Sequence, residues 1–284
     1  ALAPSAGEVS GLYQVVVPVQ SQSTMELRKA AASGLQTIFV RVSGRADTLK
    51  NQDIRKAVGA AQSYLKQYSY KRERDAVDGS EALTVILEFE RELVDGQLRV
   101  AGLPLWPANR PSILFWLAVD DGEGRLIAGL ETSPEAVAAI QHHSTRRGLP
   151  INLPLLDLED NIALSVDTLW AFKTPAIAKA SSRYQSDILL FGKATRLSSG
   201  KWLGACRLSF EGRIIEFEVQ ADDLDAFVGR AVDRVAEQLG EQYAIVPVSI
   251  AQDGILMRLQ GVRNFTDYAR IVSYLDKLAA IRMV

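Results

Sequence analysis

The fold is decided by residues 174–210, which read TPAIAKASSRYQSDILLFGKATRLSSGKWLGACRLSF. Thr174-Pro175 is typical of a helix start, because proline is tolerated in the first turn of a helix. Asp187–Gly192 is a short apolar run that predicts a strand, and the polar turn Ser198–Gly200 leads to a second strand, Lys201–Leu208. A helix followed by a strand hairpin predicts an α/β arrangement for the middle of the chain.

The residues around this stretch extend the same domain. Ile113–Val119 is apolar at every position, which is typical of a central strand with both faces buried. Other predicted elements are a helix from Ser133-Pro134 to Arg147, a strand candidate at Ile151–Leu156, a strand at Ile214–Val219 and a helix at Leu224–Tyr243. We therefore expect residues 112–243 to form a mixed-sheet α/β domain with flanking helices and an antiparallel hairpin.

The first part of the chain alternates strand and helix patterns and predicts an αβ sandwich over residues 11–102. The predicted elements are a strand at Leu12–Val17, a helix from Thr24 to Gly44, a helix at Asn51–Gln67, paired strands Tyr68–Arg74 and Leu83–Glu90 around an Asp78-Gly79 turn, and a helix at Leu93–Leu103.

Domain boundaries follow from proline content and length. Residues 103–111 hold Pro104, Pro107 and Pro111, which indicates a proline-rich junction. Residues 1–10 are expected to be an exposed N-terminal segment, and residues 244–284 a small ββαβ unit that must pack on the rest or on a partner. The predicted fold class is thus α+β with α/β character, in three small αβ units.

Composition and charge exclude several classes of function. Of the 284 residues, 48% are hydrophobic and 23% charged, and the net charge is −2, so nothing favours an electrostatic grip on nucleic acid or an anionic membrane. No apolar run approaches the roughly 20 residues of a transmembrane helix. The single cysteine, Cys206, cannot form an internal disulfide, and its place in a predicted strand favours a buried, unreactive thiol.

The chain begins Ala1-Leu2-Ala3. Small residues at alternate positions are typical of what a signal peptidase leaves behind, so we expect an exported, periplasmic protein whose signal peptide has been removed. The alternative is that these residues are left over from an expression tag.

The sequence contains no recognisable catalytic arrangement of side chains and no familiar cofactor-binding motif. The two histidines, His142 and His143, are adjacent on a predicted helix and favour a solvated helix end over a metal or catalytic site. The glycines do not fall between a strand and a helix, so neither a dinucleotide-binding fingerprint nor a P-loop is predicted. We expect no catalytic residues and no cofactor.

Carboxylates give the best case for an enzyme. Asp120 and Asp121 follow one predicted strand and Asp157 follows another, and acidic strand ends could together bind Mg²⁺. Lys193, after a third strand, could neutralise a phosphate. The alternative is that Asp120 and Asp121 serve a turn and Asp157 caps a helix.

A set of tryptophan and arginine residues is the best candidate for partner binding, because these types dominate interface hot spots. Trp106 and Trp170 fall in predicted loops, Arg110 lies in the proline-rich junction, and Arg183 precedes a strand. The alternative is that they pack at domain junctions.

Several short motifs, in this order, resemble an exported proteobacterial family of unknown function, the domain of unknown function 2066. The motifs are Val40–Gly44, Gln67–Tyr70, Leu105–Pro107 before Asn109–Pro111, Ala180–Tyr184, and Gly261-Val262 before Tyr268. The resemblance covers nearly the whole chain and implies an envelope protein with a signal peptide and no established activity. The middle part is loosely similar to TolB amino-terminal-type α/β domains, which fixes no function.

The leading hypothesis is a non-enzymatic periplasmic protein that acts as a scaffold or binding module for another envelope protein or a cell-wall component. A divalent-metal-dependent hydrolase or phosphoryl-transfer enzyme using Asp120, Asp121 and Asp157 is one alternative. A small-molecule sensor with an apolar pocket between the first two units is another.

Overall fold

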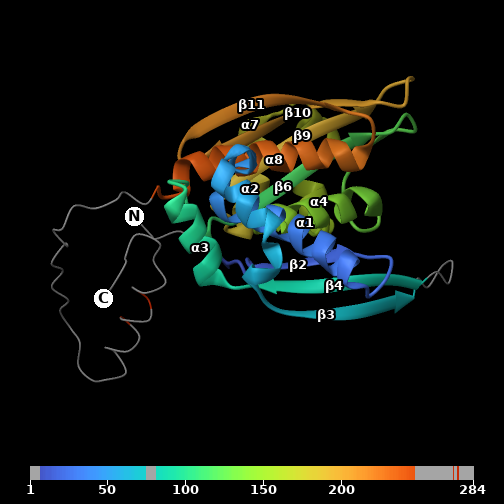
Figure 1. Ribbon diagram of the computed structural model, residues 1–284. Helices are drawn as coiled ribbons and strands as arrows, with labels where there is room; N and C mark the ends of the chain where they lie inside the picture. The colour runs from blue at the N-terminus through green and yellow to red at the C-terminus, as the bar shows by residue number, and fades with distance from the viewer. Residues whose placement is uncertain (1–6, 75–80, 247–270, 272–273, 275–284) are drawn as a thin grey trace. The chain divides into compact units, whose positions relative to one another are not determined.

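The computed structural model describes residues 7–74 and 81–246, together with residues 271 and 274 (Figure 1). The chain divides into two compact units: unit 1 comprises residues 1–10 and 108–238, and unit 2 comprises residues 11–107 and 239–284. The predicted α+β class is confirmed, with a three-stranded antiparallel sheet and a six-stranded mixed sheet, each accompanied by helices. In the part of the chain that the structure describes, no helix is long and apolar enough to cross a membrane.

Unit 2 is built on the three-stranded sheet, in the order β2-β4-β3. Helix α1 packs on one face of this sheet, where Leu35, Ile38 and Phe39 are fully buried (Figure 1). Its described elements are β2 (Gln14–Pro18), α1 (Thr24–Ser43), the 3₁₀ turn η1 (Ala46–Lys50), α2 (Gln52–Gly59), the 3₁₀ turn η2 (Ala61–Tyr64), β3 (Leu65–Arg74), β4 (Glu81–Phe89) and α3 (Arg91–Val100).

The helix predicted at Asn51–Gln67 is wrong in its second half. Helix α2 ends at Gly59, and the chain enters β3 at Leu65, which pairs with Phe89 of β4. Pairing with the sheet outweighs the local helical pattern, as tertiary context often does. The Asp78-Gly79 turn and most of the predicted 244–284 unit lie outside the described residues.

Unit 1 is built on the six-stranded sheet, in the order β11-β10-β9-β6-β7, with β8 also paired to β6. The central strand β6 is parallel to β8 and β9 and antiparallel to β7. Its elements are β1 (Gly7–Glu8), β5 (Asn109–Arg110), β6 (Ile113–Asp120), β7 (Arg125–Ile127), α4 (Pro134–Arg147), β8 (Ile151–Asn152), α5 (Leu158–Ala163), α6 (Val166–Trp170), α7 (Thr174–Ser181), the 3₁₀ turn η3 (Ser182–Tyr184), β9 (Ile188–Arg196), β10 (Trp202–Phe210), β11 (Arg213–Ala221) and most of α8 (Leu224–Tyr243). The last residues of α8, from Leu239, belong to unit 2.

Both faces of this sheet are buried at its central strand β6, as the all-apolar pattern of that strand predicts. Trp116 and Phe191 pack on one face against α6 and α7, and the Trp116 indole nitrogen donates to Ser181 Oγ at 2.9 Å. Phe115 and Leu208 are fully buried on the opposite face, along which α8 runs (Figure 1). The sheet therefore forms the rigid core of unit 1.

The strand predicted at Ile151–Leu156 is mostly wrong. Strand β8 contains only Ile151 and Asn152, after which the chain leaves the sheet at Leu153-Pro154. Proline has no backbone N–H to donate to a ladder, which accounts for the early end. The short helices α5 and α6 follow this departure. A helix after Asp157 was one of the alternatives that the sequence left open, whereas α6 was not predicted.

Candidate functional site

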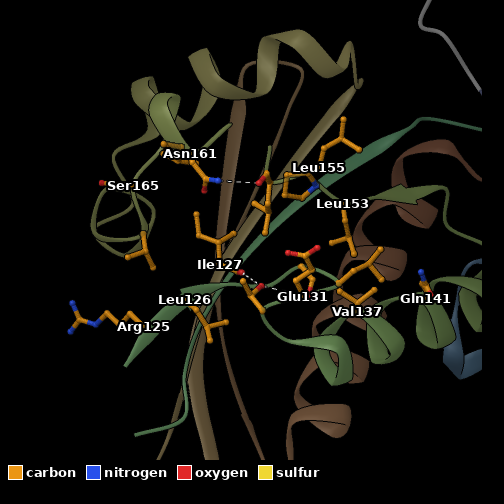
Figure 2. Close-up of a pocket in the computed structure, with 17 residues that line it drawn as sticks. Arg125, Leu126, Ile127, Glu131, Val137, Gln141, Leu153, Leu155, Asn161 and Ser165 are labelled. Carbon is orange, nitrogen blue, oxygen red and sulfur yellow. Dashed lines mark hydrogen bonds between the residues drawn. The ribbon is translucent and has the colours of Figure 1, made fainter. Parts of the chain in front are cut away.

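A cavity of about 750 Å³ opens inside unit 1, beside the edge of the sheet where β7 and β8 both pair with β6 (Figure 2). Its walls come from β7, the loop at residues 129–132, α4, the segment at residues 153–156 after β8, and the residues that join α5 to α6. Strand β8 pairs with only the first two residues of β6 and β7 with only the last three. These two short strands leave room beside the sheet for the cavity.

The interior of the cavity is mainly aliphatic. Ile127, Leu153 and Leu164 are among the eleven apolar residues that line it, against six with polar or charged side chains. Figure 2 shows the Glu131 carboxylate directed toward the space between Ile127 and Leu153, whereas Arg125 points away at the far end. Glu131 makes no ion pair or hydrogen bond with the residues that the structure describes. An apolar cavity with one convergent charged group is typical of a binding site.

One wall of the cavity is held in an unusual backbone conformation. Leu156 has a φ of +54°, in the left-handed region that residues with a side chain rarely adopt. Its N–H donates to Asp160 Oδ2 at 2.9 Å, which fixes this conformation. Its side chain lies against Gly129, where an added Cβ would be 2.4 Å from Leu156 Cδ1.

Asp160 is the centre of a buried polar cluster behind this wall. Its side chain is 1% exposed and accepts hydrogen bonds from the Tyr184 hydroxyl and from Arg183 Nη1, the latter at 3.1 Å. Burial, and then the bond to Asp160, raise the pKa of Tyr184 to about 12. The cluster joins α5 to the 3₁₀ turn η3 and so anchors the cavity wall to the core.

Asp157 caps α5 and pairs with the same arginine. Its Oδ1 accepts from the Asp160 N–H at 3.0 Å, and its two oxygens accept from the two terminal nitrogens of Arg183 at 2.8 Å each. The hydrogen bonds from Arg183 lower the pKa of Asp157 to about 2. Both oxygens of Asp157 are therefore engaged within the chain.

Asp120 and Asp121 serve the turn between β6 and β7. Asp120 accepts from the Gly122 N–H at 3.2 Å and lies 3.6 Å from Arg125, while Asp121 accepts from the Glu123 N–H at 3.0 Å. The turn-and-cap alternative of the sequence analysis thus describes these carboxylates and Asp157. The described ranges contain no group of three or more His, Cys, Asp or Glu side chains that could hold a metal ion.

Lys193, which the sequence suggested could neutralise a phosphate, makes its described contacts with α6 and the residues that follow it. Its Nζ donates to the Trp170 carbonyl at 3.1 Å and lies 4.8 Å from the centre of the Phe172 ring. This lysine therefore stabilises the end of α6.

Acidification should weaken the Asp157–Arg183 pair. Because the pKa of Asp157 is lowered from 3.8 to about 2 on folding, its contribution to stability is complete above pH 4 and is lost as the pH falls towards 2. Asp157→Asn keeps an oxygen that can cap α5 but removes the charge. We expect the wild type to be more stable than Asp157→Asn at pH 7, with the difference disappearing near pH 2. Urea unfolding of both proteins between pH 7 and pH 2 measures this difference in the free energy of unfolding. A difference that stays constant with pH would contradict a charged Asp157–Arg183 pair.

The four predicted partner-binding residues occupy different environments. Trp106 and Arg110 are buried inside the fold, at 1% and 0% exposure. Arg110 donates to the carbonyls of Arg147 and Gly148 and so closes the end of α4. Trp170 is partly exposed, with the Arg125 guanidinium 4.3 Å from its ring centre, and Arg183 belongs to the cluster around Asp160.

Four aliphatic residues around the cavity were missed by the sequence analysis. We call them the apolar rim: Leu130 (75% exposed), Leu155 (71%), Leu158 (76%) and Ile162 (77%). Leu130 and Leu155 line the cavity, and Leu158 and Ile162 lie one turn apart on α5. Among the described residues of unit 1, every other exposed large hydrophobic side chain is at most 50% exposed. The only sequence signal was the 155, 158, 162 spacing, which is typical of one face of a helix.

The prediction of a solvated helix end at the histidines is wrong for one of them. His142 is exposed, but the side chain of His143 is only 12% exposed because α8 packs against α4 at Gly229. His143 Nδ1 accepts from Arg146 Nε at 3.2 Å, and its Nε2 lies 3.2 Å from an Asp225 oxygen.

The prediction for the single cysteine is confirmed. Cys206 is fully buried in β10, and burial raises the pKa of its thiol to about 12. Its reactivity is therefore suppressed in the folded chain.

Comparison with known proteins gives one family match. Residues 6–107 match a domain of unknown function, DUF8605. The predicted resemblance to the domain of unknown function 2066 is therefore wrong, and the loose likeness to TolB-type domains is dropped with it. The short motifs behind that resemblance are helix stops and aromatic anchors, which recur in unrelated proteins. The matched region ends before the cavity.

No curated protein matches the chain. Two solved structures are similar at low identity: the Protein Y N-terminal domain of Thermus thermophilus (12% identity, 47% of this chain and 98% of that one, TM-score 0.23), and a competence-damaged protein (CinA) superfamily member of Enterobacter cloacae (13% identity, 51% of this chain and 85% of that one, TM-score 0.28).

Proposed function

We propose that this chain is a non-enzymatic binding module that docks another protein through the apolar rim and the cavity of unit 1. The observation that carries the proposal is the gathering of the four most exposed large aliphatic side chains of described unit 1 in the segments that enclose the cavity. Single exposed apolar residues are ordinary, whereas several around one hollow mark an interaction site.

The supporting structure behind the rim favours binding over chemistry. The carboxylates of Asp120, Asp157 and Asp160 are engaged in a turn, a helix cap and ion pairs, and the bonds of Asp157 and Asp160 hold the wall of the cavity in place. Such a preorganised wall reduces the ordering cost of binding. We further propose that the partner belongs to the cell envelope, as expected in the sequence analysis. Fractionation of cells that make the full-length gene product tests this location.

Crosslinking from the rim tests the proposed function. With a photo-crosslinking amino acid in place of Leu158, we expect one discrete adduct in cells; with the same amino acid in place of Leu203, on β10, we expect none. Leu155→Gln with Ile162→Gln should reduce the adduct at least tenfold, because both leave the fold intact but remove apolar contact area. Equal adducts from both positions, or an adduct that survives the double substitution, would rule out docking at the rim.

A small-molecule sensor is the second candidate, because about 750 Å³ falls within the range of ligand pockets. This cavity lies inside unit 1, whereas the sequence analysis placed the sensor pocket between two units. Leu158 and Ile162 do not line the cavity, so the two functions are distinguishable. Ligand binding that is unchanged in Leu158→Gln with Ile162→Gln would favour the sensor over the docking module.

A further inference from the structure

We propose that the partner segment is a basic amphipathic helix, whose aliphatic side chains enter the cavity and whose lysine or arginine pairs with Glu131. This inference rests on the proposed docking function and adds the charge and the form of the partner. The aliphatic lining of the cavity would contact the apolar face of the helix, and Glu131 would pair with its cationic side chain.

Charge around the cavity favours a cationic partner. Arg183 lies within 3.5 Å of three carboxylates, those of Asp157, Glu159 and Asp160, so one cation faces three anions there. Arg125 lies 3.6 Å from Asp120 and 3.6 Å from Asp167, so one cation faces two anions. Both arginines are thus more than balanced before a partner arrives.

Glu131 adds a carboxylate that no described residue neutralises, and it is directed into the cavity (Figure 2). Of these charged residues, only Glu131 and Arg125 line the cavity itself, and the cluster of Asp157, Glu159 and Asp160 lies behind its Leu156 wall. An anionic segment would meet repulsion at this site, whereas a lysine or arginine would gain an ion pair with Glu131.

The sheet edge beside the cavity gives little support to a partner strand. Strand β7 is only three residues long, and the carbonyl of Ile127 already accepts a hydrogen bond from the Thr132 hydroxyl at 2.6 Å. Strand addition depends on a free row of backbone groups. The rim offers aliphatic side chains instead, and an amphipathic helix in a groove is held by such side chains.

The test uses the full chain and two synthetic peptides of about fourteen residues, roughly four helical turns. Both peptides present the same leucine face; one carries lysine at its polar positions and the other glutamate. Binding is measured by fluorescence anisotropy of labelled peptide. We expect the lysine peptide to bind and the glutamate peptide to bind at least tenfold more weakly. Glu131→Gln should weaken the lysine peptide about fivefold, which corresponds to about 1 kcal/mol for one partly exposed ion pair. The matched control, Glu92→Gln on α3 of unit 2, should leave binding unchanged.

Each outcome separates this inference from the docking function itself. If both peptides bind equally and depend on Leu155→Gln with Ile162→Gln, docking stands and the basic partner is overturned. If Glu131→Gln and Glu92→Gln act alike, or neither peptide binds, the inference is again overturned. If the chain self-associates in sedimentation and the double rim substitution abolishes this, the occupant is a second copy and the inference fails. Peptide binding that ignores the rim substitutions contradicts the docking function as well.

Discussion

Gly204→Ala should destabilise unit 1 by about 3 kcal/mol or more, the upper end of the cost of overpacking a well-packed core. Gly204 lies in β10, and a Cβ built on it would be 1.9 Å from the Lys193 carbonyl oxygen and 3.0 Å from the Ala194 Cα. Both obstacles are backbone atoms of β9, which is paired with β10 on one side and with the central strand β6 on the other. No side-chain rotation relieves this clash, so β9 and β10 must separate.

Cys206 provides a local measure of that separation. It is the only cysteine in the chain, lies two residues beyond Gly204 on the same strand, and is fully buried. We expect the thiol to react slowly with a thiol reagent in the wild type and at least a hundredfold faster in Gly204→Ala, since about 3 kcal/mol corresponds to more than two decades in the population of the open form.

The matched control is Gly96→Ala in the middle of α3, where an added Cβ meets nothing within 4 Å. That change should stabilise the chain by about 0.5–1 kcal/mol, because alanine is the better helix former. A Gly204→Ala protein with wild-type thiol protection would show that β10 can move aside at little cost, contrary to the register of the sheet.

Elements with strong periodicity were predictable from the sequence. The start signals place the beginnings of α4 at Pro134 and of α7 at Thr174 correctly. They place that of α1 within one residue, because its N-cap is Ser23 and not Thr24. The apolar pattern of β6 also predicted a central strand correctly, because burial on both faces leaves a continuous signature. In each of these cases, the residues that determine the element lie within a short segment of the sequence.

The cavity and its rim were not predictable for the opposite reason. Leu155 looks like a core residue in a strand pattern, and only the early end of β8 leaves it exposed. Conversely, Trp106 looks like an exposed anchor in a loop, yet the fold buries it at 1% exposure. Exposure depends on which distant segments cover a residue, and that information is absent from the local pattern.

The carboxylates show a similar ambiguity in chemical role. Asp157 after a predicted strand is consistent with either a metal ligand or a helix cap, and the sequence analysis left both open. Its partner Arg183 lies 26 residues away in sequence, so the pair forms only when α5 and η3 meet in the fold. The same meeting brings Asp160 to Tyr184, which no short motif reveals.

Asp160→Ala is the second substitution for which we expect a large effect, about 2–4 kcal/mol of destabilisation. Asp160 is 1% exposed and accepts hydrogen bonds from the Leu156 N–H, the Tyr184 hydroxyl and Arg183. Alanine leaves two neutral donors without a partner in a buried site, and each costs about 1–3 kcal/mol. Asp157 still neutralises Arg183, which keeps the loss below that of an isolated buried charge.

The loss should also reach the binding site, because Asp160 holds the strained backbone of Leu156. Without that hydrogen bond, the φ of +54° has little to maintain it, and the segment that carries Leu155 should relax. We therefore expect Asp160→Ala to weaken rim-dependent crosslinking even at temperatures where the chain remains folded. Asp222→Ala, at an exposed aspartate that follows β11, is the matched control and should change stability by less than about 0.5 kcal/mol. Urea unfolding and crosslinking yield measure the two effects together. If Asp160→Ala is destabilised but crosslinks at wild-type yield, the polar cluster stabilises the fold without shaping the rim, and the preorganisation argued for the cavity wall is wrong.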